Sequence, residues 1–141
     1  MPSRGEAVTA AKSWLRTPWG HQGRLKGIRA DCAGVVNMVG FEIGAVTAED
    51  AGNTNYGRTP NPLQMKAALD KLYDRGELNG QPRPGSILWI RPGNYPQHIG
   101  VVSDRGTLIH AVTDRCVEET PLAAFPARRI VAVYEYRGVI D

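Results

Sequence analysis

The chain has 141 residues, of which 42% are hydrophobic and 22% are charged, a composition typical of globular proteins long enough to bury a core. The net charge is +3, and no basic block alternates with aromatic residues, which argues against a nucleic-acid-binding protein. No apolar run reaches the length of a membrane span, so no membrane anchor is expected.

The first residues lack the apolar core of a secretory signal, so we expect the protein to be made in the cytoplasm. If it works beyond a membrane, another component must carry it there. No repeat, linker or low-complexity segment divides the sequence. We therefore interpret residues 1–141 as a single domain.

Three helices are predicted in the N-terminal half, over residues 3–16, 31–44 and 61–75. Ser3 and Glu6 have the spacing of a capping box at the start of the first helix. Asp31 is the predicted N-cap of the second helix. Asn61 and Pro62 are a start signal for the third, and Gly76 is expected to end it.

The C-terminal half is predicted to be mainly β. Strands are expected over residues 86–90, 97–103, 107–112 and 128–136. Turns are expected over 91–96 and 104–106, and a polar segment over 114–120 precedes a short helical turn over 121–125. Because the helices come first and the antiparallel strands follow, the predicted class is α+β, with N-terminal helices packed on a small antiparallel sheet.

Cys32 stands at the predicted start of the second helix, next to Asp31. Unpaired N–H groups and the positive end of the helix dipole lie there, and both are expected to lower the pKa of a thiol. A thiolate attacks carbonyl groups, so Cys32 is a candidate nucleophile. The alternative is that Cys32 only packs in the core, as Cys116 is expected to do. A disulfide between them is not expected, and no Cys or His has the spacing of a metal site.

His98 and His110 lie on two predicted strands joined by the turn at residues 104–106. In that hairpin Val101 is opposite Ile109, which places the two histidines on one face, offset diagonally. A thiol at a helix start near two histidines is the arrangement of a nucleophile, a base and a group that orients the base. The sequence therefore favours a catalytic site formed by Cys32, His98 and His110.

Five short segments, in this order, resemble motifs of the NlpC-type cell-wall cysteine peptidases: residues 16–19 (Arg-Thr-Pro-Trp), 31–36 (Asp-Cys-Ala-Gly-Val-Val), 84–88 (Pro-Gly-Ser-Ile-Leu), 98–102 (His-Ile-Gly-Val-Val) and 109–111 (Ile-His-Ala). The resemblance extends over about residues 7–137. Residues 21–24 and 128–130 resemble the branch of this family found in phage tails and gene transfer agents.

The resemblance implies a papain-like NlpC-type fold in which Cys32 is the nucleophile, His98 the general base and His110 the orienting residue. It implies hydrolysis of peptidoglycan stem peptides, commonly between γ-D-glutamate and meso-diaminopimelate, with no metal or other cofactor. It also implies phage-like tail-tip or hub proteins as partners, and a virion- or tail-associated enzyme acting in the host periplasm.

The sequence departs from this family's pattern near Trp19, which replaces a tyrosine of the cleft and oxyanion region. An indole N–H donates a hydrogen bond but cannot accept one. His21 and Gln22 replace the residues usual after it, either as polar cleft residues or as turn caps. Together with Asp31 they are the candidates for the substrate and oxyanion side of the site. The excursion over residues 47–75 is longer than the core of this family needs, and it is expected either to wall the cleft or to dock onto a tail protein.

Two other functions remain open at this point. One is a structural tail-tip component that keeps the peptidase fold without activity, an alternative raised by the departure at Trp19. The other is a different acyl chemistry, such as that of an amidase or a lipid acyltransferase. The lack of a basic amphipathic helix argues against lipid substrates.

Overall fold

The computed structural model describes residues 1–59, 61–78, 82–93 and 97–141. Its α-helices are α1 (Arg4–Lys12), α2 (Cys32–Glu42), α3 (Ala48–Ala51) and α4 (Pro62–Leu72). Its strands are β1 (Arg24–Leu25), β2 (Arg29–Ala30), β3 (Asp74–Arg75), β4 (Ile87–Ile90), β5 (His98–Val102), β6 (Thr107–Ala111), β7 (Val117–Pro121) and β8 (Ile130–Glu135). Two short 3-10 helices, η1 (Leu122–Ala124) and η2 (Ala127–Arg129), precede β8.

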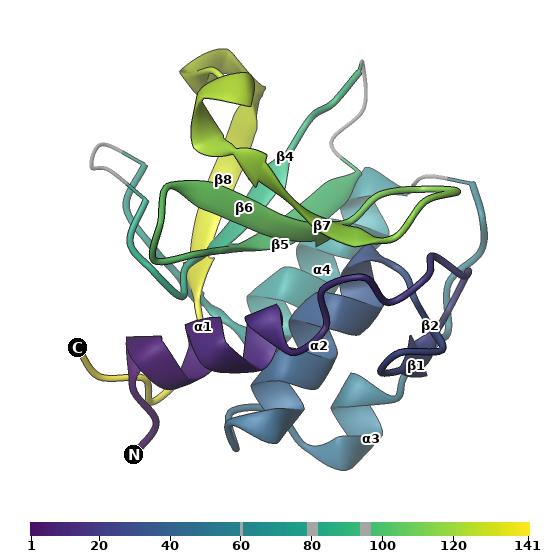
Figure 1. The fold of residues 1–141 in the computed structure, drawn as a ribbon, viewed down its shortest axis with the longest axis horizontal. Helices are drawn as coiled ribbons and strands as arrows, with labels where there is room; N and C mark the ends of the chain where they lie inside the picture. The colour runs from purple at the N-terminus through teal and green to yellow at the C-terminus, as the bar shows by residue number, and fades with distance from the viewer. Residues whose placement is uncertain (60, 79–81, 94–96) are drawn as a thin grey trace.

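The main sheet has six strands in the order β3-β8-β4-β5-β6-β7, with antiparallel pairing throughout. Strands β1 and β2 form a separate hairpin. The helices lie on one side of the main sheet, and the segment between β7 and β8 lies on the other (Figure 1). This arrangement agrees with the predicted α+β class.

Each face of the sheet packs against its own apolar cluster because successive strand residues point to opposite faces. Trp89 and Ile109 belong to the larger cluster, which includes residues of α1, α2 and α4. Leu88 and Leu108 belong to the smaller one, which is covered by Phe125 and its neighbours. Helix α2 thus lies on the first face, and the segment between β7 and β8 closes the second.

The predicted helix starts are confirmed by their side-chain caps. Both bonds of the capping box between Ser3 and Glu6 are present at α1. Asp31 accepts the N–H of Gly34 at 2.7 Å, and Asn61 caps α4 in the same way. Capping of this kind is local in sequence, which is why the pattern of residue types identified it.

The helix ends differ from the prediction. Helix α1 ends at Lys12 rather than at residue 16, and α4 ends at Leu72 rather than at residue 75. The third helix stops early because Asp74 and Arg75 pair with β8 as strand β3. Likewise, the polar segment after residue 114 contains an edge strand, β7, paired with β6 along its whole length. Pro60 and residues 94–96 of the predicted turn lie outside the described residues.

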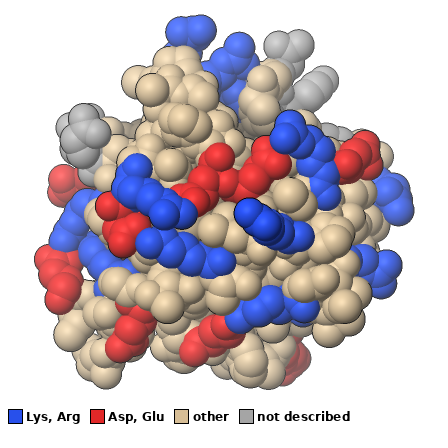
Figure 2. Space-filling view, viewed as in Figure 1, with Lys and Arg blue, Asp and Glu red and all other residues tan. Residues whose placement is uncertain are grey.

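The register of the hairpin that carries the two histidines is confirmed, since Val101 is opposite Ile109 and Val102 is opposite Leu108. On the face shown in Figure 2, Lys and Arg are interspersed with Asp and Glu and do not form one basic surface. No helix in the described ranges combines the length and apolar character needed to cross a membrane.

Gly100 sits in the middle of β5, where a side chain has no room. A Cβ atom there would lie 2.8 Å from Leu108 Cγ and 2.9 Å from the carbonyl oxygen of Ile109. Gly100→Ala is therefore expected to lower the free energy of unfolding by about 1–3 kcal/mol, measured by denaturant titration. Gly93→Ala is the matched control, because a Cβ at Gly93 meets no described atom within 4 Å. Equal stabilities of the two variants would show that the β5–β6 contact is not tight.

Candidate functional site

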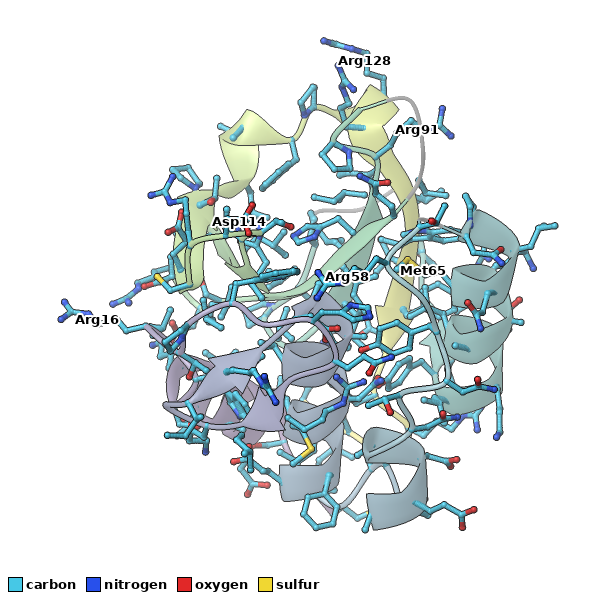
Figure 3. All side chains as sticks on the ribbon, turned by 90° about the vertical axis from the view of Figure 1, so that its right-hand side faces the viewer. Arg16, Arg58, Met65, Arg91, Asp114 and Arg128 are labelled. Carbon is cyan, nitrogen blue, oxygen red and sulfur yellow. The ribbon has the colours of Figure 1, made fainter. Side chains whose placement is uncertain are left out.

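A cleft of about 550 Å³ opens beside the N-terminus of α2. Its lining comes from the start of α2, residues 53–59, helix α4, and the ends of β5 and β6 that lie nearest to that helix start. Figure 3 views the molecule from the side on which Arg58 and Met65, both lining residues, are found. Cys32 and His98 line the same cleft, so the structure brings the candidate nucleophile and base to one place.

Cys32 is the first residue of α2 and is half-buried at the edge of the larger core. Its pKa is raised to about 11, first by burial and then by the carboxylate of Asp31. The N–H groups of Ile99 and Ala33 act in the opposite direction without overcoming this rise. The expectation that the helix start lowers the pKa of this thiol is therefore wrong, because desolvation outweighs the helix N–H groups. The resting form is a neutral thiol.

The two histidines form a short chain of hydrogen bonds. Nε2 of His98 lies 2.7 Å from Nδ1 of His110, and Nε2 of His110 lies 2.7 Å from Oγ1 of Thr120. When His110 donates to Thr120, its Nδ1 accepts the Nε2–H of His98. His98 is then left with a lone pair on Nδ1, which makes no hydrogen bond to any described residue. This is the tautomer that a general base requires.

Both imidazoles are neutral at neutral pH. Burial lowers the pKa of His98 to about 3, and the positive form of His110 beside it acts in the same direction. Burial also lowers the pKa of His110, although Glu118 opposes this change. Phe125 packs edge-on against His110, with ring centroids 5.9 Å apart, and excludes water from that side. The pair is therefore fixed by packing as well as by hydrogen bonds.

The histidine pair does not lie on the sheet face that packs against α2. By strand alternation, His98 and His110 share the face of Leu108 and Val102, which belongs to the smaller core. His98 lines the cleft because it is the first residue of β5, at the strand end, whereas His110 lies behind it. Within the described parts of the chain, no hydrogen bond joins Cys32 to His98.

Asp31 is buried and accepts hydrogen bonds from four groups. The N–H groups of Gln22 and Gly34 donate at 2.8 and 2.7 Å. The Arg24 guanidinium donates at 3.0 Å and the Tyr56 hydroxyl at 2.5 Å. A carboxylate with these partners holds the helix start and the surrounding chain in place. Since it is an acceptor, it cannot donate a hydrogen bond to an oxyanion, and its part in the substrate and oxyanion side of the site is to hold other residues in place.

Gln22 does not line the cleft, but its hydrogen bonds hold residues 53–59 in place beside it. Its side-chain amide donates to the carbonyls of Thr54 and Tyr56, at 2.8 and 2.7 Å. Its backbone has a φ of 61°, in the left-handed region, where the hydrogen bond to Asp31 helps to hold it. Of the two alternatives for the excursion over residues 47–75, the structure agrees with its forming a wall of the cleft, because residues 53–59 and helix α4 contribute to the lining.

Trp19 and His21 line the cleft, as was considered for them. The ring of His21 packs edge-on against Tyr56, with centroids 5.8 Å apart. Tyr56 was not among the predicted site residues, because a single tyrosine in a polar segment carries no periodic or motif signal. Its pKa is raised, first by burial and then by its hydrogen bond to Asp31, so it remains a hydrogen-bond donor.

The basic residues near Cys32 and the second cysteine also have partners within the protein. Arg24 forms an ion pair with Asp31, and Nζ of Lys26 lies 2.8 Å from a carboxylate oxygen of Glu42. Neither residue is therefore free to bind a substrate carboxylate. Sγ of Cys116 lies 3.8 Å from Oε2 of Glu118. Cys32 and Cys116 are both free thiols. Residues 1–59, 61–78, 82–93 and 97–141 contain no group of three or more side chains positioned to hold a metal ion.

Comparisons with known proteins identify the fold. No protein-family model matches the sequence, and no curated protein matches it. Among solved structures, the NlpC/p60 domain of the peptidoglycan hydrolase SagA superposes with a TM-score of 0.65 at 16% identity, covering 94% of this chain and 98% of that one.

Two further structures agree with this match. NlpC1 from Trichomonas vaginalis gives a TM-score of 0.65 at 18% identity, covering 95% of this chain and 44% of that one. An NlpC/P60 family protein from Bacillus cereus ATCC 10987 gives a TM-score of 0.66 at 18% identity. The match covers 96% of this chain and 40% of that one. The chain thus spans nearly all of the SagA domain but less than half of the other two proteins. The predicted papain-like NlpC-type fold is confirmed.

The raised pKa of Cys32 can be measured by the rate of thiol alkylation against pH, in a Cys116→Ala background. The rate is expected to rise with an inflection near pH 11. Asp31→Asn is expected to move the inflection to lower pH, because a carboxylate beside a thiol disfavours the thiolate. An inflection at or below ~8.5, the value of an ordinary thiol, would contradict this description of the site.

The lowered pKa of His98 links stability to pH. Below pH 6.5 the unfolded chain binds a proton at this histidine that the folded protein does not bind until about pH 3. Stability is therefore expected to fall as the pH falls through this range, by up to about 2 kcal/mol between pH 7.5 and pH 5. Denaturant titrations at the two pH values measure the loss, and His98→Gln should reduce it. The same pH dependence in both proteins would exclude His98 as its source.

Proposed function

We propose that this protein is a cysteine endopeptidase that hydrolyses peptidoglycan stem peptides, with the bond between γ-D-glutamate and diaminopimelate as the expected target. The observation that carries this proposal is the position of Cys32 and His98 on one cleft, with His110 bound to His98 from behind. The likeness in fold to a domain of a peptidoglycan hydrolase supports the choice of substrate.

In the proposed first step, the Cys32 sulfur attacks the amide carbon while its proton moves to Nδ1 of His98. Because the thiol and the imidazole are both neutral at rest, proton transfer accompanies the attack rather than preceding it. The imidazolium that forms keeps its Nε2–H bonded to His110. The attraction between the thiolate and the imidazolium offsets part of the cost of creating two charges in a partly buried site.

The developing oxyanion requires donors that are not already used. The backbone N–H of Cys32, at the start of α2, finds no acceptor among the described residues and is one such donor. The indole N–H of Trp19, a cleft residue, is a second candidate, since it likewise makes no hydrogen bond in the described ranges. A donor alone suffices here, so the exchange of a tyrosine for Trp19 is compatible with this role.

In the second step, the His98 imidazolium gives its proton to the departing amine, which leaves an acyl group on the Cys32 sulfur. His98 then takes a proton from a water molecule as that water attacks the thioester. The sulfur leaves and takes that proton back from His98. The product is released as a carboxylate after its acid proton passes to the solvent.

We also propose that a phage-like tail or a gene transfer agent delivers the enzyme to the host periplasm, with tail-tip or hub proteins as partners. This part of the proposal is supported only by the resemblance of residues 21–24 and 128–130 to that branch of the family. The competing function is an inactive tail-tip component. The neutral resting state of Cys32 and the replacement at Trp19 are the observations that favour it.

The test is the release of new amine termini from diaminopimelate-type peptidoglycan, with the products read by mass spectrometry. Wild type is expected to cleave, and Cys32→Ala to lose activity by at least ~10³-fold, because the nucleophile is gone. His98→Gln is expected to lose ~10²–10⁴-fold, the usual contribution of a general base. Cys116→Ala removes a thiol outside the cleft and serves as the matched control, with activity equal to wild type.

If wild type releases no more amine termini than Cys32→Ala, the peptidase proposal is wrong and the structural tail-tip function takes its place. If cleavage occurs at a stem-peptide bond other than the γ-D-glutamyl bond, the masses of the products identify that bond.

A further inference from the structure

Three of the described arginines gather at one end of the molecule, where β4 ends and β8 begins. Arg91 follows β4, and Arg128 and Arg129 belong to η2, which precedes β8. The backbone N–H of Arg91 donates to the carbonyl of Arg129 at 2.7 Å, so the two segments lie side by side. Figure 3 shows Arg91 and Arg128 at the top of the view, and both residues are exposed. We call these three residues the arginine patch.

No acidic residue neutralises the arginine patch. The two stretches that contain it, residues 82–103 and 121–134, have no Asp or Glu in their sequence. Within the described ranges none of the three arginines forms an ion pair, whereas Arg83, Arg105 and Arg137 each form one. The residues outside those ranges include no Asp or Glu either. At the top of Figure 2, Lys and Arg accordingly appear without Asp or Glu beside them.

The patch is held in place by one of its own members. The Arg129 guanidinium donates through Nη1 to the carbonyls of Arg91, Pro92 and Gly93, at 3.4, 3.3 and 3.2 Å. It therefore fixes the turn that carries Arg91. The guanidinium groups of Arg91 and Arg128 make no hydrogen bond to a described residue and remain available to a ligand. Each presents a fork of N–H donors that suits a carboxylate or a phosphate.

The patch borders the cleft in which catalysis is proposed. Pro92, directly after Arg91, lines that cleft, and so does His98 at the start of β5. Ile90 is opposite His98 in the sheet, so Arg91 lies one residue beyond the pair that includes the proposed base. A polymer that places one segment in the cleft can therefore reach the patch with a neighbouring segment.

We infer that the arginine patch binds carboxylates of the insoluble peptidoglycan, away from the bond that is cleaved. This inference rests on the proposed function and adds a second contact with the same polymer. A glutamate linked through its γ-carboxyl keeps its α-carboxylate free, so a polymer of such stem peptides repeats this anion. Arg91 and Arg128 receive the carboxylates of stem peptides that adjoin the one in the cleft.

The surroundings of the patch suit this partner better than a membrane or a nucleic acid. Within the described parts of residues 82–103 and 121–134, no large apolar side chain is exposed that could insert into a lipid layer. Nucleic-acid sites commonly make about 6–10 phosphate contacts and stack bases on aromatic side chains. The patch offers only a few cations, which fits carboxylates that are spaced along a polymer.

The first experiment measures binding with Cys32→Ala protein, so that the polymer stays intact. The protein is mixed with insoluble diaminopimelate-type peptidoglycan, cleared of phosphate polymers by hydrofluoric acid, and the unbound fraction is measured after centrifugation. Changing Arg91→Gln and Arg128→Gln together is expected to raise the Kd about three- to tenfold at low salt. Converting the carboxylates of the polymer to amides, or adding salt to about 0.5 M, should weaken binding of the unchanged patch by a similar factor.

The matched control changes Arg16→Gln and Arg83→Gln together, which removes the same net charge elsewhere. Both residues are exposed. Arg16 lies apart from the patch in Figure 3, and Arg83 is paired with Asp141 at the C-terminal end of the chain. This control should bind like Cys32→Ala protein with an unchanged patch. An equal loss in the two double variants, no loss in the patch variant, or undiminished binding to the amidated polymer overturns the inference.

Activity separates this contact from the chemistry. With Cys32 intact, the ratio of the rate on insoluble peptidoglycan to the rate on a soluble stem tripeptide should fall about three- to tenfold in the patch variant. The control should keep the ratio of wild type. Cleavage with an unchanged ratio overturns the inference while the peptidase stands, whereas patch-dependent binding without cleavage supports the patch and rejects the peptidase. Tighter patch-dependent binding to phosphatidylglycerol vesicles or to duplex DNA than to peptidoglycan overturns the choice of partner.

Discussion

The site depends on one buried carboxylate, that of Asp31. It caps the helix that presents Cys32, and it accepts hydrogen bonds from Gln22, Arg24 and Tyr56, which come from two other parts of the chain. A buried carboxylate is stable only when its oxygens are satisfied, and here four donors satisfy them. The same charge raises the pKa of the neighbouring thiol. The group that organises the cleft therefore adds to the effect of burial, which is the larger cause of the protonated resting thiol.

The histidine pair provides the base that a protonated nucleophile requires. A base in a partly buried site needs a defined tautomer, and the hydrogen bonds from His98 through His110 to Thr120 allow the one in which Nδ1 of His98 carries the lone pair. The low pKa of His98 means that the imidazole is available to accept a proton throughout the neutral range. It also means that a separated thiolate and imidazolium are costly before a substrate is present. Attack and proton transfer are coupled in the proposed mechanism for this reason.

The sequence predicted the features that depend on neighbouring residues, and missed those that depend on distant ones. The capping residues Ser3, Asp31 and Asn61 act within three positions, and a tight turn sets the hairpin register. Strand β3 exists only because β8 lies beside it, so a helical pattern concealed it. Tyr56 joins the site through a contact with Asp31 across 25 positions, and desolvation of Cys32 arises only when the core is assembled.

The hydrogen bonds of Asp31 also join the nucleophile to a wall of the cleft. Tyr56 donates to Asp31, and the side-chain amide of Gln22 donates to the carbonyls of Thr54 and Tyr56. The segment over residues 53–59, which lines the cleft, is therefore held by the same carboxylate that caps the helix carrying Cys32. The base is positioned separately, because His98 is bonded to His110 on β6 and His110 to Thr120 on β7. The nucleophile and the cleft wall thus depend on one carboxylate, and the base depends on the pairing of neighbouring strands.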